Sequence, residues 1–169
     1  MSAPIQIVDE DDRPLYATTQ DEAYRKGLYH RVVRVMISDE NGRILLQKRS
    51  STKQIFPNCW DNSAAGHVDS GESYEVAAYR ELEEELGISG RHLREIDYYR
   101  TSVQYRNMKM NKFVKLYVLQ LPGNTKFQLQ TKEVAAIQWV SREQLAQLVN
   151  EHPDKISDGL QESFDRMYR

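Results

Sequence analysis

The sequence is poor in the residues that form covalent cross-links and membrane spans. It has one cysteine, Cys59, among 169 residues, so no disulfide can form within the chain. No apolar run approaches the ~18 residues that a membrane-spanning helix needs. The first residues, MSAPIQIVDEDDRP, lack the basic stretch followed by an apolar stretch that is typical of a secretory signal. We therefore expect a cytoplasmic protein in a reducing compartment, with no membrane partner.

The chain also lacks an excess of positive charge. Its 23 Lys and Arg residues against 25 Asp and Glu residues give a formal net charge of −2, with His counted as neutral. General nucleic-acid binders carry a basic surface that neutralises phosphates, so this balance argues against a nucleic-acid partner. No repeat, low-complexity tract or Pro/Ser/Gly-rich linker divides the chain. We therefore expect one domain over residues 1–169.

Hydrophobic alternation and turn residues predict both strands and helices. Residues 1–29 are expected to form a small hairpin and a short helix that ends at Gly27. An Asn-Gly turn joins two β-rich runs, 31–37 and 43–49. Further strands are expected at 95–105, 112–121, 127–130 and 134–140, and further helices at 73–86, 142–150 and 157–167. This mixture predicts an α+β fold, an α/β/α sandwich around a mixed sheet.

Four glutamates crowd into the short stretch RELEEEL, residues 80–86. At about 100° per residue, Glu81, Glu84 and Glu85 fall within an arc of roughly 100° on a helix, while the leucines lie on another side. Like charges at this spacing repel each other by a few tenths of a kcal/mol per pair in water. A hard divalent cation, which prefers oxygen ligands, would offset that repulsion. A solvated acidic helix face is the alternative that the glutamates alone leave open.

The spacing of the surrounding residues favours the metal. Within GHVDSGESYEVAAYRELEEELGI, residues 66–88, the order is Gly66, five residues, Glu72, seven residues, Arg80-Glu81, an aliphatic residue, any residue, Glu84-Glu85, any residue, Gly87 and an aliphatic residue. This pattern resembles the Nudix box, the signature of the Nudix hydrolase superfamily, with every fixed position filled. The resemblance covers roughly residues 30–150 and implies the fold of that family.

Nudix enzymes split a diphosphate joined to another moiety, with water attacking phosphorus and Mg²⁺ or Mn²⁺ bound. The resemblance implies that Glu84 and Glu85 are metal ligands and that Glu81 is a ligand or the base that activates water. It also implies that Gly66 offers its carbonyl to a metal, at a place where glycine permits close approach.

The resemblance gives other residues supporting roles. Arg80, counted with the catalytic group, would form with Glu72 the ion pair that holds the loop to the helix, and Gly87 would end the helix as its C-cap. The base varies across the family, so the box alone does not identify it. Glu133, just before the strand at 134–140, is the best candidate outside the box.

Residues 30–68 also resemble the isopentenyl-diphosphate isomerase branch of the superfamily, in LLQKRS, in the FP..W loop and in NSAAGH. That branch needs a cysteine two residues before the loop histidine, where this chain has Ala65, and a metal-binding histidine where it has Ala23. The Glu-x-Glu pair of the isomerase falls near Asn111 and Phe113. Alanine cannot move a proton and phenylalanine cannot bind a metal, so we expect no isomerase activity.

Several other side chains are candidates for contact with substrate. Lys48 and Arg49 end a strand that enters the site region, and His67 follows Gly66; the plainer alternative for each is a solvated or locally hydrogen-bonded side chain. The hairpin around residues 105–115 carries a basic patch that suits an anionic substrate or simple solubility: Arg106, Lys109, Lys112 and Lys115. Three tyrosines leave a base-stacking pocket and the interface of a homodimer open as alternatives: Tyr98, Tyr99 and Tyr105.

We therefore expect an Mg²⁺- or Mn²⁺-dependent hydrolase that cleaves the diphosphate linkage of a small nucleoside-diphosphate-type compound. Two alternatives stay open. One is an isoprenoid diphosphate as the substrate, suggested by the neighbouring branch. The other is a Nudix-fold module that senses such a ligand without turnover.

Overall fold

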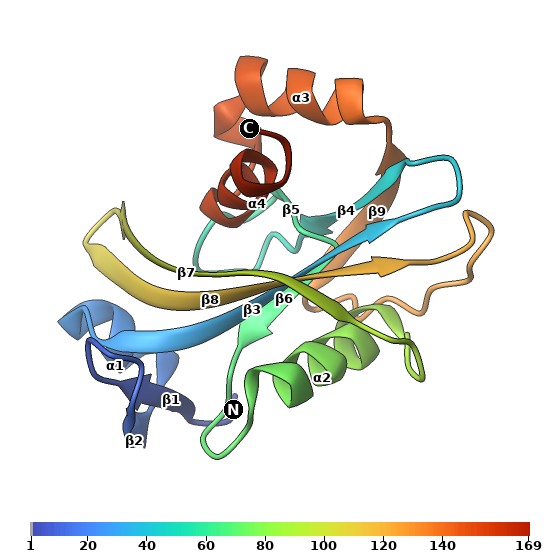
Figure 1. Ribbon diagram of the computed structural model, residues 1–169. Helices are drawn as coiled ribbons and strands as arrows, with labels where there is room; N and C mark the ends of the chain where they lie inside the picture. Colours follow the sequence, from blue (N-terminus) through green and yellow to red (C-terminus); the bar gives the residue numbers. More distant parts are fainter. Residues whose placement is uncertain (1) are drawn as a thin grey trace.

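A computed structural model describes residues 2–169 as a mixed β-sheet with helices on both faces (Figure 1). The strands are β1 (Ile5–Val8), β2 (Pro14–Thr18), β3 (Tyr29–Ser38), β4 (Ile44–Arg49), β5 (Trp60–Asp61), β6 (Ala64–His67), β7 (Arg94–Tyr105), β8 (Met108–Gln120) and β9 (Val134–Val140). The helices are α1 (Gln20–Lys26), α2 (Tyr74–Leu86), α3 (Arg142–Glu151) and α4 (Asp158–Tyr168), with a short 3-10 turn at Pro153–Lys155. None of these helices is long and apolar enough to cross a bilayer.

Strand β3 is the centre of the sheet. It pairs antiparallel with β1, β4 and β6 and parallel with β8, so the sheet is mixed. Strand β4 pairs with β9, and β7 with β8 forms a long hairpin. The α+β class, the mixed sheet and the N-terminal hairpin followed by a short helix are confirmed.

The two faces of β3 build two apolar cores. Val33, Val35 and Ile37 pack with the buried side of α2, whereas Val32 and Met36 pack with α3 and α4 on the other face. Successive side chains of a strand point to opposite faces. Figure 1 shows the result: α2 covers one face of the sheet, and α3 with α4 covers the other.

The strand expected at 127–130 is wrong. The backbone N–H groups of Gln128 and Gln130 donate to the carbonyls of Leu86 (2.9 Å) and Glu85 (3.1 Å), at the C-terminal end of α2. Those carbonyls have no partner within the helix. The segment therefore completes a helix end instead of joining the sheet, and its alternating apolar residues pack on the core beside it.

Two further boundaries differ from expectation. Strand β8 begins at Met108, four residues before the predicted start, because the turn at Arg106 and Asn107 is only two residues long. The loop expected before the box contains the short strands β5 and β6, which pair with β4 and β3. Their few residues carry too little periodicity to be recognised in a sequence.

Gly87 ends α2 in a left-handed conformation (φ 69°), and a Cβ atom there would lie 2.8 Å from the Cβ of Gln128. We expect Gly87→Ala to lower the free energy of unfolding by about 1–2 kcal/mol in urea denaturation. Gly90→Ala is the matched control, because Gly90 has a similar φ (65°) with no atom near its missing Cβ. Equal losses in the two variants would contradict a role for the contact with Gln128.

Candidate active site

Helix α2 carries its glutamates along one edge of its packed face. Ser73 caps its N-terminus by accepting a hydrogen bond from the backbone N–H of Val76 (3.2 Å). The buried face of the helix is formed by small and aliphatic side chains: Ala77, Ala78, Leu82 and Leu86. This packing fixes the rotation of the helix, so the glutamates are buried to different degrees. Glu85 is 6% exposed, and the side chains of Glu81 and Glu84 are 12% and 58% exposed.

Glu85 lies deepest. One of its carboxylate oxygens accepts hydrogen bonds from the side-chain amide of Gln47 (2.8 Å) and the backbone N–H of Ala65 (3.1 Å). Burial and the negative charge of Glu81 raise the pKa of Glu85 well above its ordinary value, against the opposing effect of those hydrogen bonds. A charged carboxylate this deep needs a compensating positive charge.

Glu81 lies against the backbone of β6. A Cβ atom at position 66 would lie 2.1 Å from its carboxyl group, so that carboxyl could keep this position only beside a glycine. Burial raises the pKa of Glu81 to about 7, although the charge of Arg80, whose guanidinium donates to it (2.7 Å), acts in the opposite direction. Gly66 thus brings the backbone of the loop as close to the glutamates as sterics allow.

Arg80 ties the loop to the helix. Its guanidinium donates to both oxygens of Glu72 (2.8 and 3.0 Å) and to the carbonyl of His67 (2.9 Å). Glu72 in turn accepts from the backbone N–H of Asp69 (2.9 Å). The ion pair expected between Glu72 and Arg80 is therefore present, and the same guanidinium also reaches Glu84 (3.3 Å).

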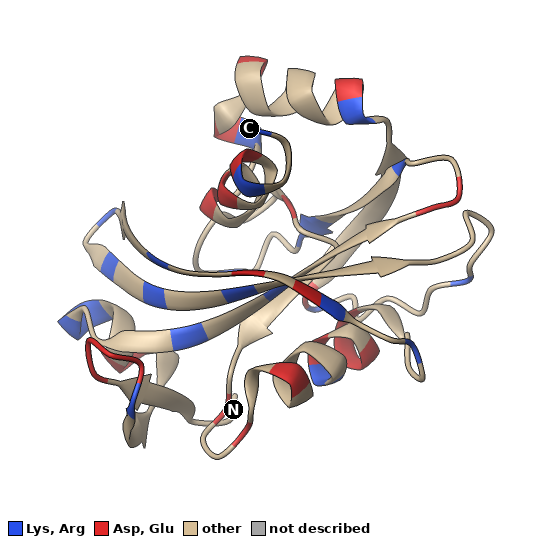
Figure 2. Ribbon diagram, viewed as in Figure 1, with Lys and Arg blue, Asp and Glu red and all other residues tan. Residues whose placement is uncertain are grey.

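A cleft of about 440 Å³ opens beside these residues. Most of the predicted site residues border it: Gly66, His67, Arg80, Glu81, Glu84, Glu85 and Glu133. Glu133 comes from the turn before β9, and its carboxylate pairs with the ammonium group of Lys53. Figure 2 shows the acidic residues gathered along α2, and basic residues along the β7–β8 hairpin.

Arg49 and Lys48 separate at the end of β4. Arg49 donates to Asp61 (2.8 Å) and to the carbonyl of Ile55, and it borders hollows that adjoin the cleft. Lys48 lies over the ring of Trp60 (5.8 Å), a residue that packs with the α3–α4 core. The structure therefore brings Arg49 to the site region and does not bring Lys48 there.

His67 borders the cleft but is hydrogen-bonded within the protein. Its Nε2 lies 2.8 Å from the hydroxyl of the buried Tyr24. Burial, and then the positive charges of His30 and Lys112, lower its pKa well below the ordinary value, so the ring is neutral at pH 7.

The predicted tyrosines do not share one pocket. Tyr99 is buried beside Arg34 (2.5 Å), Tyr98 donates to Asp12 (2.7 Å) and Tyr105 lies against Phe56.

Among the residues that border the cleft and were missed in the sequence, two border the hollows beside it as well. Gln20, the first residue of α1, and Lys53, in the loop after β4, line the cleft and both hollows beside it. No motif marks either residue. Their placement depends on how the N-terminal segment and the loop fold over the sheet, which local spacing does not encode.

The residues fit a hard divalent cation. Carboxylate oxygens and a nearby backbone are the ligands that Mg²⁺ and Mn²⁺ prefer, with waters completing the shell. Within residues 2–169, no three Asp, Glu, His or Cys side chains converge closely enough to surround an ion as they stand. Arg80 draws Glu81 and Glu84 into ion pairs instead. A cation beside Glu85 would supply the charge that this buried carboxyl lacks, so Glu81, Glu84 and Glu85 are the residues that would hold it.

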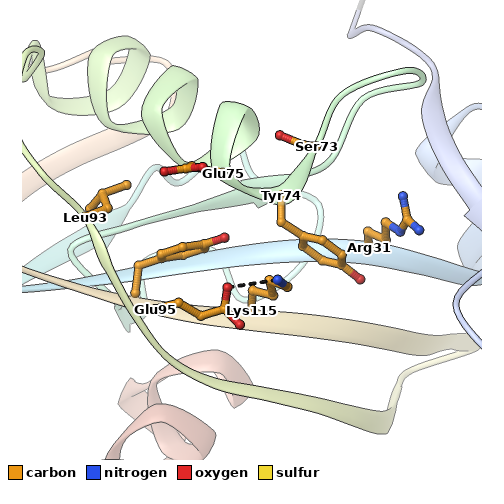
Figure 3. A pocket seen from close by; sticks show the side chains of 8 residues that line it. Arg31, Ser73, Tyr74, Glu75, Leu93, Glu95 and Lys115 are labelled. Atoms are coloured by element: carbon orange, nitrogen blue, oxygen red, sulfur yellow. Dashed lines mark hydrogen bonds and ion pairs between the residues drawn. The ribbon is translucent and has the colours of Figure 1, made fainter.

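A second, separate hollow of about 420 Å³ lies at the N-terminal end of α2 (Figure 3). It is lined by Arg31, Ser73, Tyr74, Glu75, Leu93, Glu95, Lys115 and Tyr117. Lys115 and Glu95 form an ion pair across it (2.8 Å). It shares no residue with the cleft beside the glutamates.

Comparison with known proteins identifies the family. Residues 28–160 match the NUDIX domain family, so the chain belongs to it. An uncharacterised Nudix hydrolase of Streptomyces coelicolor is 46% identical over 86 residues, 51% of this chain and 48% of that protein, so the matched segment spans about half of the relative. Isopentenyl-diphosphate Delta-isomerase 2 of Photorhabdus laumondii is 29% identical over 167 residues, 95% of this chain and 93% of that one.

A solved structure supports the fold. The crystal structure of a Deinococcus radiodurans protein superimposes with a TM-score of 0.79 at 23% identity, covering 98% of this chain and 99% of that one. Relatives of both kinds, Nudix hydrolases and isomerases, are therefore similar to this chain.

Positions at which the sequence is expected to differ from the isomerase branch lie beside the cleft. Ala65 donates its backbone N–H to Glu85, and no thiol is present there. On β8, the residues that line the adjoining hollow are Met110 and Lys112, whereas Phe113 packs in the core under α2. The side chains that line this hollow are therefore one residue before Asn111 and Phe113, the two positions expected to match the Glu-x-Glu pair. Neither pair contains a carboxylate.

Proposed function

We propose that this chain hydrolyses the diphosphate linkage of a small nucleoside-diphosphate-type compound, with Mg²⁺ or Mn²⁺ as cofactor. One observation carries the proposal. Glu85 and Glu81 are buried side by side under the one glycine that lets the β6 backbone approach them, and both pKa values are raised by that burial. Such a pair is unfavourable in an empty cleft and favourable beside a cation.

The residues have distinct tasks in this proposal. Bound metal supplies charge neutralisation of the diphosphate and lowers the pKa of a water. Glu84 and Glu85 hold it, and Glu81 is either a third ligand or the acceptor of the proton from the attacking water. Arg80 fixes the orientation of Glu81 through its ion pairs with Glu72.

Positive charge near the cleft suits a phosphate group. Lys53 borders the cleft and Arg49 borders the hollows beside it, and guanidinium and ammonium groups are suited to phosphate oxygens. Glu133 remains the alternative proton acceptor, held in the cleft wall by Lys53. Glu133 is free to accept a proton, and Lys53 to bind a phosphate, only when a phosphate group has broken the ion pair between these two residues.

Isomerisation is disfavoured by the residues near the cleft. A proton shuttle between two faces of an alkene needs an acid and a base, and Ala65 and Met110 supply neither. Hydrolysis of an isoprenoid diphosphate and non-catalytic sensing are the remaining alternatives. The sensor is disfavoured because all the glutamates of the box are present.

The test is a panel of nucleoside diphosphates, nucleotide sugars, dinucleotide cofactors and prenyl diphosphates, incubated with Mg²⁺, Mn²⁺ or EDTA and assayed by chromatographic separation of the monophosphate products. We expect turnover of at least one nucleoside-diphosphate compound, lost in EDTA and strongly reduced in Glu84→Gln. Turnover that survives Glu84→Gln undiminished would contradict the assigned metal site. A wild type that binds a compound of the panel but turns none over would favour the sensor.

A further inference from the structure

The cleft beside α2 continues into a smaller hollow of about 100 Å³ on the α4 side of the sheet. The two share five residues, Gln20, Lys53, Ala65, Gly66 and His67, so they meet at the backbone of β6. The remaining lining comes from several elements: Tyr24, Val32, Arg34, Arg49, Ile55, Asp61, Met110, Lys112, Asp158 and Gly159. If a diphosphate binds at the glutamates, its organic group extends either into this hollow or away from it.

Ion pairs with little solvent access form much of the wall. The side chains of Lys112 and Asp158 are 6% and 16% exposed and pair with each other. Beside them, Arg34 (3% exposed) pairs with Glu162 and donates to the hydroxyl of Tyr99 (2.5 Å). Burial alone would raise the pKa of Asp158, but the charges of Lys112 and Arg34 outweigh it and lower that pKa, so the carboxylate is ionised.

A buried ion pair is seldom the most stable choice of side chains for the wall of a hollow. Apolar side chains of similar volume are often as stable as a buried ion pair or more so, because the charges need not be desolvated. The same face of β8 shows the contrast, since Val114 and Leu116, two and four residues after Lys112, are packed in the apolar core. The charged pair therefore points to recognition of a polar group.

We propose that this hollow binds a hydroxylated sugar ring attached to the diphosphate, with Lys112 donating to a ring hydroxyl and Asp158 accepting from one. The inference rests on the proposed function, because the ring is placed relative to a diphosphate at the glutamates. An isoprenyl group of similar size would offer no further hydrogen bond to Lys112 or Asp158 and would exclude water from this ion pair, which is unfavourable.

Three diphosphate esters test the proposal, because they share the reacting group and differ only in the attached moiety. Methyl diphosphate does not reach the hollow, ribose 5-diphosphate carries five carbons with hydroxyls, and isopentenyl diphosphate carries five apolar carbons. We expect the wild type to prefer the ribosyl ester over the isopentenyl ester at least tenfold in kcat/KM, with Mg²⁺ present.

The double variant Lys112→Met/Asp158→Leu replaces the pair with apolar side chains. It is expected to lower kcat/KM for the ribosyl ester by about 10- to 100-fold, to leave methyl diphosphate within about threefold, and to abolish the preference over the isopentenyl ester. The matched control is Lys115→Met/Glu95→Leu, an ion pair on the other face of the same hairpin, in the separate hollow of Figure 3. It should behave as the wild type.

Unchanged methyl diphosphate turnover would show that the double variant is folded. An equal loss on all three esters, or no loss on the ribosyl ester, would overturn the proposal. If the wild type cleaves none of the three esters, the nucleotide panel decides about the proposed function, and calorimetric binding of the two five-carbon esters decides about the hollow. A ribosyl preference that the double variant loses would support it, and equal binding of the two esters would overturn it.

Discussion

Glu85→Gln is expected to lower kcat by about 10³-fold or more, with a nearly native fold. The substitution keeps the size of the side chain and one carbonyl oxygen for the N–H donors of Gln47 and Ala65. It removes the negative charge that would bind the cation, and losses of this size are typical when a group that stabilises transition-state charge is removed. Initial rates on the best substrate of the panel, across a range of Mg²⁺ concentrations, would measure it.

Glu83→Gln provides the control on the same helix. Glu83 lies between Leu82 and Glu84 in the sequence but is exposed, and it does not border the cleft. We expect its rates to stay within about twofold of the wild type, because an exposed charge far from the reacting atoms contributes little. Similar losses in both variants would indicate a general effect of negative charge along α2 and would refute a specific role for Glu85.

The box could be interpreted from the sequence because its geometry is local. Gly66, Glu72, Arg80 and the glutamates lie within one loop and one helix, where spacing fixes which side chains face the same way. The cap at Ser73 and the left-handed Gly87 are equally local, so the bounds of α2 agree with expectation to within one residue. The alternation of apolar residues likewise identified the long strands and the last two helices.

The rest depended on contacts between distant segments. Lys48 and Arg49 are adjacent in sequence, yet only Arg49 borders the site region, and the face each one occupies depends on the register of the strand. Lys112 belonged to an expected surface patch, but it is buried against Asp158, 46 positions later. Segment 127–130 resembled a strand because apolar residues alternate there, and only the position of the end of α2 explains its actual role.

The same distinction bears on the two kinds of relative. Similarity to the Photorhabdus isomerase extends over 95% of the chain, so the whole framework is compatible with either chemistry. We expect the small hollow, which Ala65, Met110 and Lys112 line, to decide between them. Fold similarity alone therefore does not decide the reaction.

In the metal-free protein, Glu81→Gln is expected to become more stable relative to the wild type as the pH rises. The pKa of Glu81 is about 7 in the fold, against an ordinary value of 4.5. Between these values the native state holds a proton that the unfolded state has released, so the free energy of unfolding of the wild type falls with pH. Each unit of difference corresponds to 1.36 kcal/mol, which gives roughly 3 kcal/mol between pH 4.5 and pH 7.

The comparison must be made between variants, because two histidines act in the opposite direction. Burial lowers the pKa of His30 to about 4, and the pKa of His67 is lowered as well, against an ordinary value of 6.5. Below pH 6.5 the unfolded histidines hold protons that the native histidines have already released, which is the reverse of Glu81. Their contribution therefore makes the protein more stable as the pH rises toward 6.5. Since both proteins contain these histidines, subtracting the wild-type curve from the Glu81→Gln curve removes their contribution and leaves that of Glu81, together with its effect on the neighbouring Glu85.

Urea denaturation with EDTA at pH 5, 6, 7 and 8 would measure this difference, and we expect it to rise by roughly 3 kcal/mol. Saturating Mg²⁺ should shrink or reverse it, because a cation that binds only the native state stabilises the ionised wild type more than the variant. A difference that is flat with pH would mean that Glu81 is ionised without a cation. A pH-dependent difference that Mg²⁺ leaves unchanged would mean that the cation does not bind beside Glu81.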